Sequence, residues 1–210
     1  MTNRLADALA KLPLVAILRG VTSAESPDIL KALIGEGFLL IEAPLNSPDP
    51  YDSIRAMRAL APPEALVGAG TVKTIPEVEA VAKAGGDLIV MPHADVAVIA
   101  AAKALGLIAL PGVATPTEAF AALAAGADGL KAFPAEMISP AVVKAWRAVI
   151  PAHVPILPVG GITPDNMQPY LAAGANGFGL GSGLYKPGDS AARVREKAAA
   201  FTAAWRKLKG

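Results

Sequence analysis

Two ionisable residues of this 210-residue chain stand inside short apolar runs, where a charged side chain is costly. Lys131 lies in GLKAFP, and Glu42 lies in LLIEAP. Burial disfavours the lysine ammonium, and a nearby cation such as Arg19 has the same effect, so the pKa of Lys131 is expected to fall. A neutral amine attacks ketones, and a carboxylate with a raised pKa suits acid–base catalysis. The pair therefore indicates Schiff-base chemistry.

Both residues also have a structural interpretation. Lys131 could protect an edge strand or extend its amine outward into solvent. Glu42 could be a solvated carboxylate at the end of a strand, or an ion-pair partner of Arg19 or Lys131. The presence of a lysine and a carboxylate together favours the catalytic interpretation over either residue taken alone.

Glycines in the last third of the chain indicate an anion site. Gly160-Gly161 follow one apolar run, and Gly181 and Ser182 follow the next in GLGSG. Phosphate sites of α/β barrels are commonly built from the loops after the seventh and eighth strands. Glycine pairs are also ordinary turn residues, and neither cluster has the spacing of a dinucleotide or P-loop motif. Their joint placement favours phosphate binding.

Further polar residues near strand ends are weaker candidates. Arg19 and Thr71 are interpreted as ligands of a carboxylate or phosphate, although Thr71 could instead cap a turn. His93 and His153 are assigned no catalytic role, and the chain has no cysteine, so a metal site is not expected. The aromatic and sulfur-containing side chains at strand ends and in helices, Met91, Phe133 and Trp146, are interpreted as packing residues.

Eight apolar runs must position these side chains, and each reads as a buried parallel strand. They are Leu14–Leu18, Leu39–Ile41, Ala65–Val67, Leu88–Met91, Leu107–Leu110, Gly129–Phe133, Ile156–Val159 and Gly177–Leu180. Between them, Ala-rich segments have helical spacing, for example Ile75–Ala84, Ala94–Leu105, Pro116–Ala125, Pro140–Val149 and Pro164–Ala173. The alternation predicts an α/β fold, either an open doubly wound sheet or a closed (β/α)8 barrel, and the short chain favours the barrel.

Helix starts are marked by a hydroxyl followed by a carboxylate three residues later. Thr74 and Thr115 have this pattern, and Ser139-Pro140 and Thr163-Pro164 repeat a cap followed by proline. No charge run or Ser-rich stretch divides the chain, so residues 1–210 are predicted to form one domain.

Composition excludes several function classes. The net charge of +1 supplies no basic field for nucleic acid or an anionic membrane. Apolar stretches are interrupted well before the roughly 20 residues needed to span a bilayer. The segment Met1 to Leu12 mixes charges among alanines and does not resemble a signal peptide, so a cytoplasmic location is expected.

Seven separated blocks, in order, resemble the bacterial 2-keto-3-deoxy-6-phosphogluconate/galactonate aldolase family. They are LVAILRG, IEAPLNSP, LVGAGTV, PGVATPTEA, GLKAFPAE, PVGGITPDN and GLGSGLY, and they extend from about Leu14 to Tyr185. The resemblance implies a (β/α)8 barrel of the class I aldolase type that needs no cofactor or metal, and it implies a homotrimer. It also implies a phosphorylated keto-acid substrate that is cleaved reversibly to pyruvate and glyceraldehyde 3-phosphate.

The resemblance also implies roles for individual residues. Lys131 matches the Schiff-base lysine, and Glu42 matches the residue that moves protons during carbinolamine formation and carbon–carbon cleavage. The positions that match family ligands are Arg19, Thr71, Gly160, Gly161, Gly181 and Ser182, with Thr71 at the pyruvate end and the glycines and serine at the phosphate. Which anion Arg19 meets is left open.

Two positions bear on which epimer is cleaved. Gluconate-type members typically read TLRTP after the glutamate-bearing strand and PTGG before the phosphate loop, whereas this chain has Asn46 in APLNSP and Val159 in PVGG. These residues favour the galactonate branch. A gluconate-specific or epimer-tolerant aldolase is the nearest alternative, and a non-catalytic phosphosugar-binding barrel is an alternative of another class.

Overall fold

The computed structural model of the protein describes residues 4–209, in which strands and helices alternate along the chain. All paired strands are parallel. The strands are β1 (Leu14–Ile17), β2 (Leu40–Pro44), β3 (Leu66–Gly70), β4 (Leu88–Val90), β5 (Ile108–Leu110), β6 (Gly112–Val113), β7 (Leu130–Ala132), β8 (Ile156–Pro158) and β9 (Phe178–Leu180). The predicted α/β class and each of the eight predicted strand regions are therefore found.

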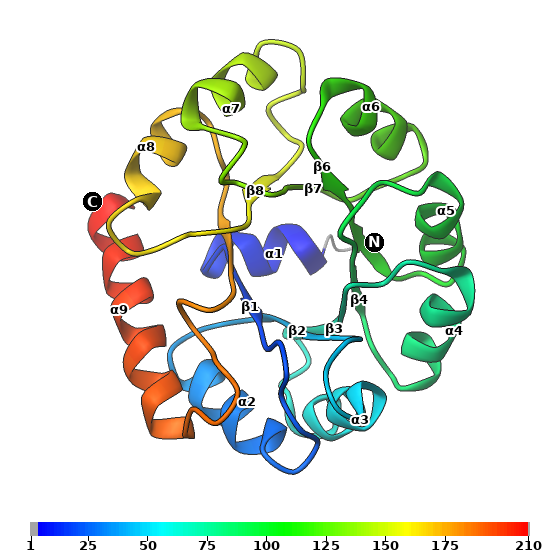
Figure 1. The fold of residues 1–210 in the computed structure, drawn as a ribbon, viewed down its shortest axis with the longest axis vertical. Helices are drawn as coiled ribbons and strands as arrows, with labels where there is room; N and C mark the ends of the chain where they lie inside the picture. Colours follow the sequence, from blue (N-terminus) through cyan, green and yellow to red (C-terminus); the bar gives the residue numbers. More distant parts are fainter. Residues whose placement is uncertain (1–3, 210) are drawn as a thin grey trace.

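The strands form two parallel sheets. One has the order β5-β4-β3-β2-β1-β9, and the other has the order β6-β7-β8. The predicted fifth strand is found as β5, and a further short strand, β6, follows it after Pro111, which has no N–H to donate to the ladder. At the opposite edge, a parallel bridge joins Val159, just after β8, to Gly179 of β9. The strands thus surround a common centre (Figure 1).

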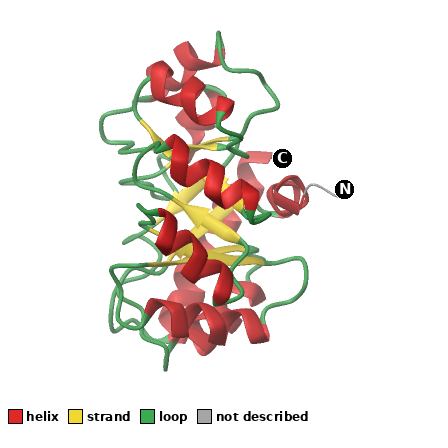
Figure 2. Ribbon diagram, turned by 90° about the vertical axis from the view of Figure 1, so that its right-hand side faces the viewer, coloured by secondary structure: helices red, strands yellow, loops and turns green. Residues whose placement is uncertain are grey.

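The helices α2 to α9 lie outside the strands, and α1 crosses the centre of the view in Figure 1. The bounds are α1 (Arg4–Lys11), α2 (Ser26–Gly35), α3 (Pro50–Leu60), α4 (Ile75–Lys83), α5 (Val96–Ala104), α6 (Pro116–Ala124), α7 (Pro140–Arg147), α8 (Met167–Ala172) and α9 (Ala191–Lys209). Figure 2 shows the same arrangement from the side, with the strands between layers of helices. Within residues 4–209, none of these helices is long and apolar enough to cross a bilayer.

Two of the four predicted helix caps are confirmed. Thr74 and Thr115 each form a capping box with the glutamate three residues later. Ser139 precedes α7 but its side chain forms no capping hydrogen bond. Thr163 was predicted wrongly, because α8 begins at Met167. The Asn166 side chain accepts from the Thr163 N–H and donates to the Gly161 carbonyl, and this local turn replaces the expected first helical turn.

Buried apolar side chains form two clusters on opposite faces of the strands. The larger cluster lies between the strands and the surrounding helices. The smaller cluster fills the space enclosed by the strands, where Leu5 and Ala8 of α1 pack with Val15, Leu66 and Leu157. Helix α1 therefore closes the end of this interior where the strands begin. The opposite end, where the strands finish, is left open for a site.

Candidate active site

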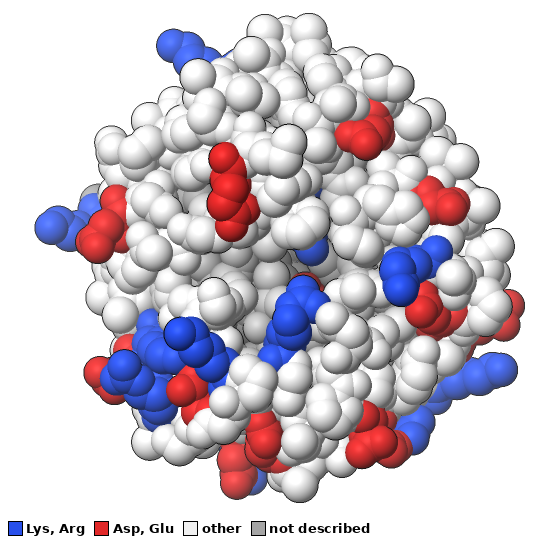
Figure 3. Space-filling model, in the orientation of Figure 1, with Lys and Arg blue, Asp and Glu red and all other residues white. Residues whose placement is uncertain are grey.

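A cavity of about 610 Å³ lies at the carboxyl ends of the strands. Figure 3 shows a hollow near the centre of this face, with Lys or Arg atoms beside it. Seven of the ten residues predicted for the site line the cavity: Arg19, Lys131, Val159, Gly160, Gly161, Gly181 and Ser182. They lie in or directly after four different strands, whose carboxyl ends the parallel strand order brings to one edge.

Lys131 is the central residue of β7 and is 6% exposed. Its backbone is in register with Gly112 on one side and Leu157 on the other. The side chain points into the interior, and its amine lies 4.6 Å from the centre of the Phe133 ring. Burial lowers the pKa of Lys131; Glu42 opposes this change, and Arg19 adds to it. The amine is thus more readily deprotonated than that of a solvated lysine.

Glu42 lies below the open cavity, in the middle of β2. The sequence placed it at a strand end, but β2 continues to Pro44, which is in register with Gly70. Glu42 is 1% exposed, and its Oε2 atom has no hydrogen-bond partner. Burial raises the pKa of Glu42 from 4.5 to about 7, against the opposing attraction of Lys131 and then Arg19. Such a carboxylate can both accept and donate a proton near neutral pH.

Glu42 and Lys131 face the same small interior void. This void is about 10 Å³ and is also lined by Val159. Its volume is at the lower limit for one water molecule. Within residues 4–209, Glu42 and Lys131 are close enough to influence each other's pKa but form no direct ion pair. A proton exchanged between them would need a short relay or a bound substrate atom.

Arg19 follows β1 and is held by the loop that follows β2. Its Nη1 atom donates to Asn46 Oδ1 at 2.7 Å, and Ser47 Oγ accepts from the Gly20 N–H at 2.8 Å. Asn46 does not line the cavity itself and reaches the site through Arg19. The two specificity candidates thus lie differently: Val159 lines both the cavity and the void, whereas Asn46 orients a cation at the rim.

Thr71 is a predicted site residue that does not line the cavity. It follows β3 directly, is half-buried and has a φ of 59°, a left-handed conformation that is uncommon for threonine. Left-handed threonine stores backbone strain of the kind found at functional sites, which agrees with its position beside Gly70 at the carboxyl end of the strands.

Residues that the sequence did not single out also line the cavity. Glu136 is the one acidic residue at its wall within residues 4–209, and Tyr185 and Lys186 follow the GLGSG segment. The Tyr185 hydroxyl donates to Glu25. Phe133, which was interpreted as a packing residue, instead borders the cavity beside the Lys131 amine. From the sequence, Lys186 could have been recognised as a site residue because it is a cation close to the GLGSG segment. No local sequence pattern indicates that Glu136 belongs to the site.

Glu136 lies against the glycines proposed for phosphate. A Cβ atom added at Gly160 would be 2.2 Å from Glu136 Oε2, and one added at Gly161 would be 3.4 Å from Oε1. Both glycines have positive φ, 121° and 59°. Within the described part of the chain, the Glu136 carboxylate has no hydrogen bond or ion pair. It is a free negative charge beside the glycine backbone.

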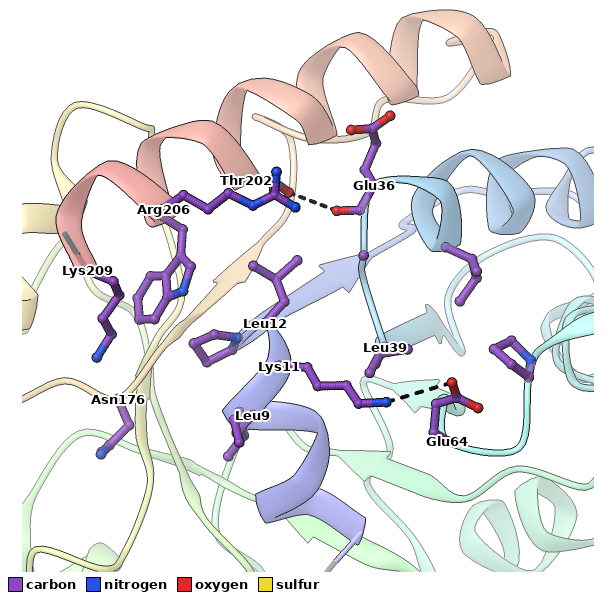
Figure 4. A pocket seen from close by; sticks show the side chains of 16 residues that line it. Leu9, Lys11, Leu12, Glu36, Leu39, Glu64, Asn176, Thr202, Arg206 and Lys209 are labelled. Carbon is purple, nitrogen blue, oxygen red and sulfur yellow. Dashed lines mark hydrogen bonds and ion pairs between the residues drawn. The ribbon is translucent and has the colours of Figure 1, made fainter.

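A larger hollow of about 840 Å³ lies at the other end of the strands, among α1, α2 and α9 (Figure 4). Several polar groups along it have partners within the fold: Lys11 pairs with Glu64 at 3.7 Å, and Thr202 donates to the Glu36 carbonyl at 3.1 Å. Ligands of parallel α/β folds bind at the carboxyl ends of strands, not at this end. The smaller cavity around Lys131 is therefore the candidate active site, although the other hollow is larger.

Comparison with known proteins decides the family. The sequence profile described as "Aldolase: KDPG and KHG aldolase" matches residues 5–194. The chain belongs to the KDPG and KHG aldolase family. Members of this family are class I aldolases, which form a Schiff base with their substrate. A lysine with a lowered pKa and a carboxylate with a raised pKa beside one interior void are the groups that such an aldolase requires.

Individual relatives match almost the whole chain. A probable 2-dehydro-3-deoxy-6-phosphogalactonate aldolase of Rhizobium meliloti (strain 1021) is 50% identical over 94% of this chain and 93% of its own length. The enzyme named 2-dehydro-3-deoxy-6-phosphogalactonate aldolase in Escherichia coli (strain K12) is 46% identical, with 94% and 96% covered. A solved structure described as native KDPGal has a TM-score of 0.93 and 45% identity, and 95% of this chain and 97% of that chain are covered.

No metal centre accompanies these groups in the part of the chain that is described. Between residues 4 and 209, no cluster of three or more histidine, aspartate or glutamate side chains gathers in a geometry that could hold a metal ion.

Proposed function

We propose that this chain is a 2-dehydro-3-deoxy-6-phosphogalactonate aldolase that cleaves its substrate reversibly to pyruvate and D-glyceraldehyde 3-phosphate. One observation carries the proposal: the buried Lys131 amine, with its lowered pKa, shares an interior void with Glu42, whose pKa is about 7, at the base of an open cavity. The two relatives at 50% and 46% identity that bear this enzyme's name support the choice of substrate.

The reaction begins with the unprotonated Lys131 amine. Its nitrogen lone pair attacks the C2 ketone to give a carbinolamine, and Glu42 in its protonated form assists the departure of the C2 oxygen as water. The product is an iminium ion, which serves as an electron sink. A low dielectric around Lys131 favours the neutral amine over the ammonium before this attack.

Carbon–carbon cleavage then uses Glu42 as a base. The carboxylate takes the proton of the C4 hydroxyl, directly or through one water, as the C4 oxygen forms a carbonyl and the C3–C4 bond breaks. The bonding pair forms the C2–C3 double bond of an enamine on Lys131. Glyceraldehyde 3-phosphate leaves, a proton is returned to C3, and water hydrolyses the resulting iminium to release pyruvate and the free amine.

The substrate's phosphate is proposed to lie at the backbone of Gly160, Gly161 and Gly181 and at Ser182. Positive φ at Gly160 and Gly161 and the absence of side chains allow close approach of an anion to this backbone. Thr71 is proposed to meet the pyruvate end. Arg19 lies on the rim and could meet either anion.

Epimer preference is proposed to depend on Val159 and Asn46. The galactonate and gluconate 6-phosphates differ at C4, whose hydroxyl must reach Glu42. Val159 lies beside both Glu42 and Lys131 at the interior void and has no hydroxyl to hold the opposite epimer. Gluconate-type relatives are more distant, for example one in Zymomonas mobilis at 33% identity over 79% of this chain.

Several wider features belong to the same proposal. The two sheets, linked by Pro111 and by the Val159–Gly179 bridge, are proposed to act as one closed (β/α)8 barrel formed by a single domain, residues 1–210. A homotrimer is proposed; a designed cage built by fusing symmetric oligomeric domains matches this chain with a TM-score of 0.92 at 45% identity and covers 95% of this chain and 74% of that chain. A cytoplasmic location stays a prediction.

A comparison of the two epimeric 6-phosphates tests the proposed substrate. Pyruvate release is measured under identical conditions, with Lys131→Ala as the control for lysine-dependent turnover. We expect faster cleavage of the galactonate epimer by the wild type and no cleavage by Lys131→Ala, which should stay folded. Faster cleavage of the gluconate epimer would contradict the substrate assignment, and full activity of Lys131→Ala would contradict the mechanism.

A further inference from the structure

Two glycines of β3 lie on the strand next to Glu42, and one of them, Gly70, faces its carboxyl group. Gly68 is in register with Glu42, and Gly70 lies one step further along the same side of β3. A Cβ atom placed on Gly70 would lie 1.2 Å from Glu42 Oε2, 2.3 Å from its Cδ and 2.8 Å from its Oε1. The three nearest heavy atoms all belong to this carboxyl group. The Glu42 carboxyl therefore occupies the space that a side chain at position 70 would fill.

Backbone conformation does not explain this glycine. Gly70 does not have the positive φ that makes glycine necessary at Gly160 or Gly161. It lies within a regular strand, where glycine weakens the sheet relative to residues with side chains. At Gly68, by contrast, an added Cβ would meet the backbone of Leu88 at 1.9 Å, so that glycine is needed for the approach of β4.

Packing must hold the Glu42 carboxyl, because hydrogen bonds do not fully hold it. Its Oε2 atom is buried and has no hydrogen-bond partner within residues 4–209. Free rotation of the side chain is thus limited mainly by the surfaces around it, and the surface under Oε2 is Gly70. We infer that Gly70 is a positioning residue that holds the Glu42 carboxyl at the depth of the Lys131 amine by leaving a space that fits it.

The inference rests on the proposed aldolase function, because it assigns Gly70 a role in proton transfer by Glu42. Gly70 does not line the open cavity, so it is not expected to contact substrate. In Gly70→Ala, the new methyl group displaces the carboxyl toward the cavity, where it is better hydrated. The displaced group then lies away from the C4 hydroxyl and regains a more ordinary acidity.

Steady-state kinetics of Gly70→Ala test this role. We expect kcat for the 6-phosphogalactonate substrate to fall by at least about 100-fold, with KM changed much less, because a misplacement of about 1 Å already has an effect of this size and Oε2 must move farther to clear the methyl group. The limb of the pH–rate profile that reports Glu42 should move to lower pH. Borohydride reduction with pyruvate should still modify Lys131. Gly35→Ala, at the end of α2 and away from the site, is the control for a glycine-to-alanine change and should keep the wild-type profile.

A stability comparison gives a second readout that does not need activity. When Glu42→Ala removes the carboxyl, the space beside Gly70 becomes empty, and Gly70→Ala should then raise the unfolding midpoint. In the wild-type background, Gly70→Ala should lower it. Such a change of sign is a coupling between the two positions that a general effect on strand β3 does not produce.

The outcomes separate the inference from the function on which it rests. An unchanged kcat and pH profile in Gly70→Ala, or a midpoint shift of the same sign in both backgrounds, would overturn the role of Gly70. If Gly70→Ala fails to fold, the unfolding midpoints of Glu42→Ala and Glu42→Ala/Gly70→Ala still test the role of Gly70. A double variant that is less stable than Glu42→Ala would overturn it. Failure of the wild type to trap pyruvate on Lys131 would instead overturn the proposed function.

Discussion

The raised pKa of Glu42 has a consequence for stability as well as for catalysis. A folded-state pKa of about 7, above the ordinary 4.5, means that the folded protein binds this proton more tightly than the unfolded chain does. Below about pH 4.5 the carboxyl is protonated in both states. As pH rises from 4.5 to 7 the unfolded chain loses the proton first, so the free energy of unfolding falls, and above 7 the loss is complete.

Replacement of the ionisable group should remove this dependence. We expect the unfolding free energy of Glu42→Gln to rise relative to that of the wild type between about pH 4.5 and pH 7, by about 3 kcal/mol at 1.36 kcal/mol for each pH unit of the interval. Denaturant unfolding of both proteins at several pH values measures the difference. Parallel stability curves across this window would contradict a buried, neutral Glu42.

Glu136 places a negative charge where the substrate's phosphate is proposed to bind. Its carboxyl lies against Gly160 and Gly161 without a partner in the described chain. We expect Glu136→Gln to lower the inhibition constant for inorganic phosphate about fivefold, since two unit charges a few Å apart in water interact by about 1 kcal/mol. Competitive inhibition by phosphate measures this. Glu64→Gln, beside the hollow at the other end of the strands, is the matched control.

Either of two results would contradict this account of Glu136. If the inhibition constant rose, the carboxyl would be helping to bind the ligand. If Glu64→Gln had an equal effect, the change would reflect net charge alone and not the position of Glu136 at the cavity wall.

At the residue scale, the sequence was most informative where an ionisable residue stands among apolar neighbours. Lys131 and Glu42 could be predicted because ionisable side chains inside apolar runs are costly. The Arg19–Asn46 hydrogen bond could not, because it joins loops after two different strands and depends on their separation in space. Glu136 was missed for a similar reason: it becomes part of the site only when its loop folds over the glycines after β8.

At the element scale, helix caps were predicted where the cap and its partner are close in sequence. Thr115 accepts from the Glu118 N–H, and Glu118 accepts from the Thr115 N–H at 2.8 Å. We expect Thr115→Ala to lower the unfolding free energy by about 1 kcal/mol without changing kcat. Denaturant titration measures this effect.

Ser139 supplies the matched control for the cap. It precedes Pro140 as Thr115 precedes Pro116, but its side chain forms no capping hydrogen bond. Ser139→Ala is therefore expected to have the stability of the wild type. Equal losses in the two variants would show that the hydroxyl acts in some way other than capping.

Two element boundaries differ from the prediction, one because of a local turn and the other because of pairing between strands. The start of α8 was placed too early because the pattern Thr163-Pro164 resembles a cap, whereas the Asn166 side chain closes a turn there. Strand β2 extends past the end of its apolar run because pairing with β3 continues to Pro44. Such pairing is a property of two strands together, and neither strand shows it alone.

At the scale of the whole molecule, the two ends of the strands differ in structure: one is closed by a helix and the other opens into a cavity. Helix α1 closes one end with Leu5 and Ala8, and the reactive groups gather at the other. Alternation of strands and helices predicted that the candidate residues would gather at one end, because parallel strands direct their carboxyl ends to one edge. It could not predict β6, which follows the fifth predicted strand after Pro111 and pairs in the other sheet.

The proposed catalysis depends on a covalent imine between Lys131 and the keto acid. Its most direct test is borohydride reduction in the presence of pyruvate, followed by mass spectrometry of the intact protein and peptide mapping. We predict one reduced pyruvyl adduct, located on Lys131 and absent from Lys131→Ala. An adduct on another lysine, or none from protein that is actively cleaving substrate, would contradict the account.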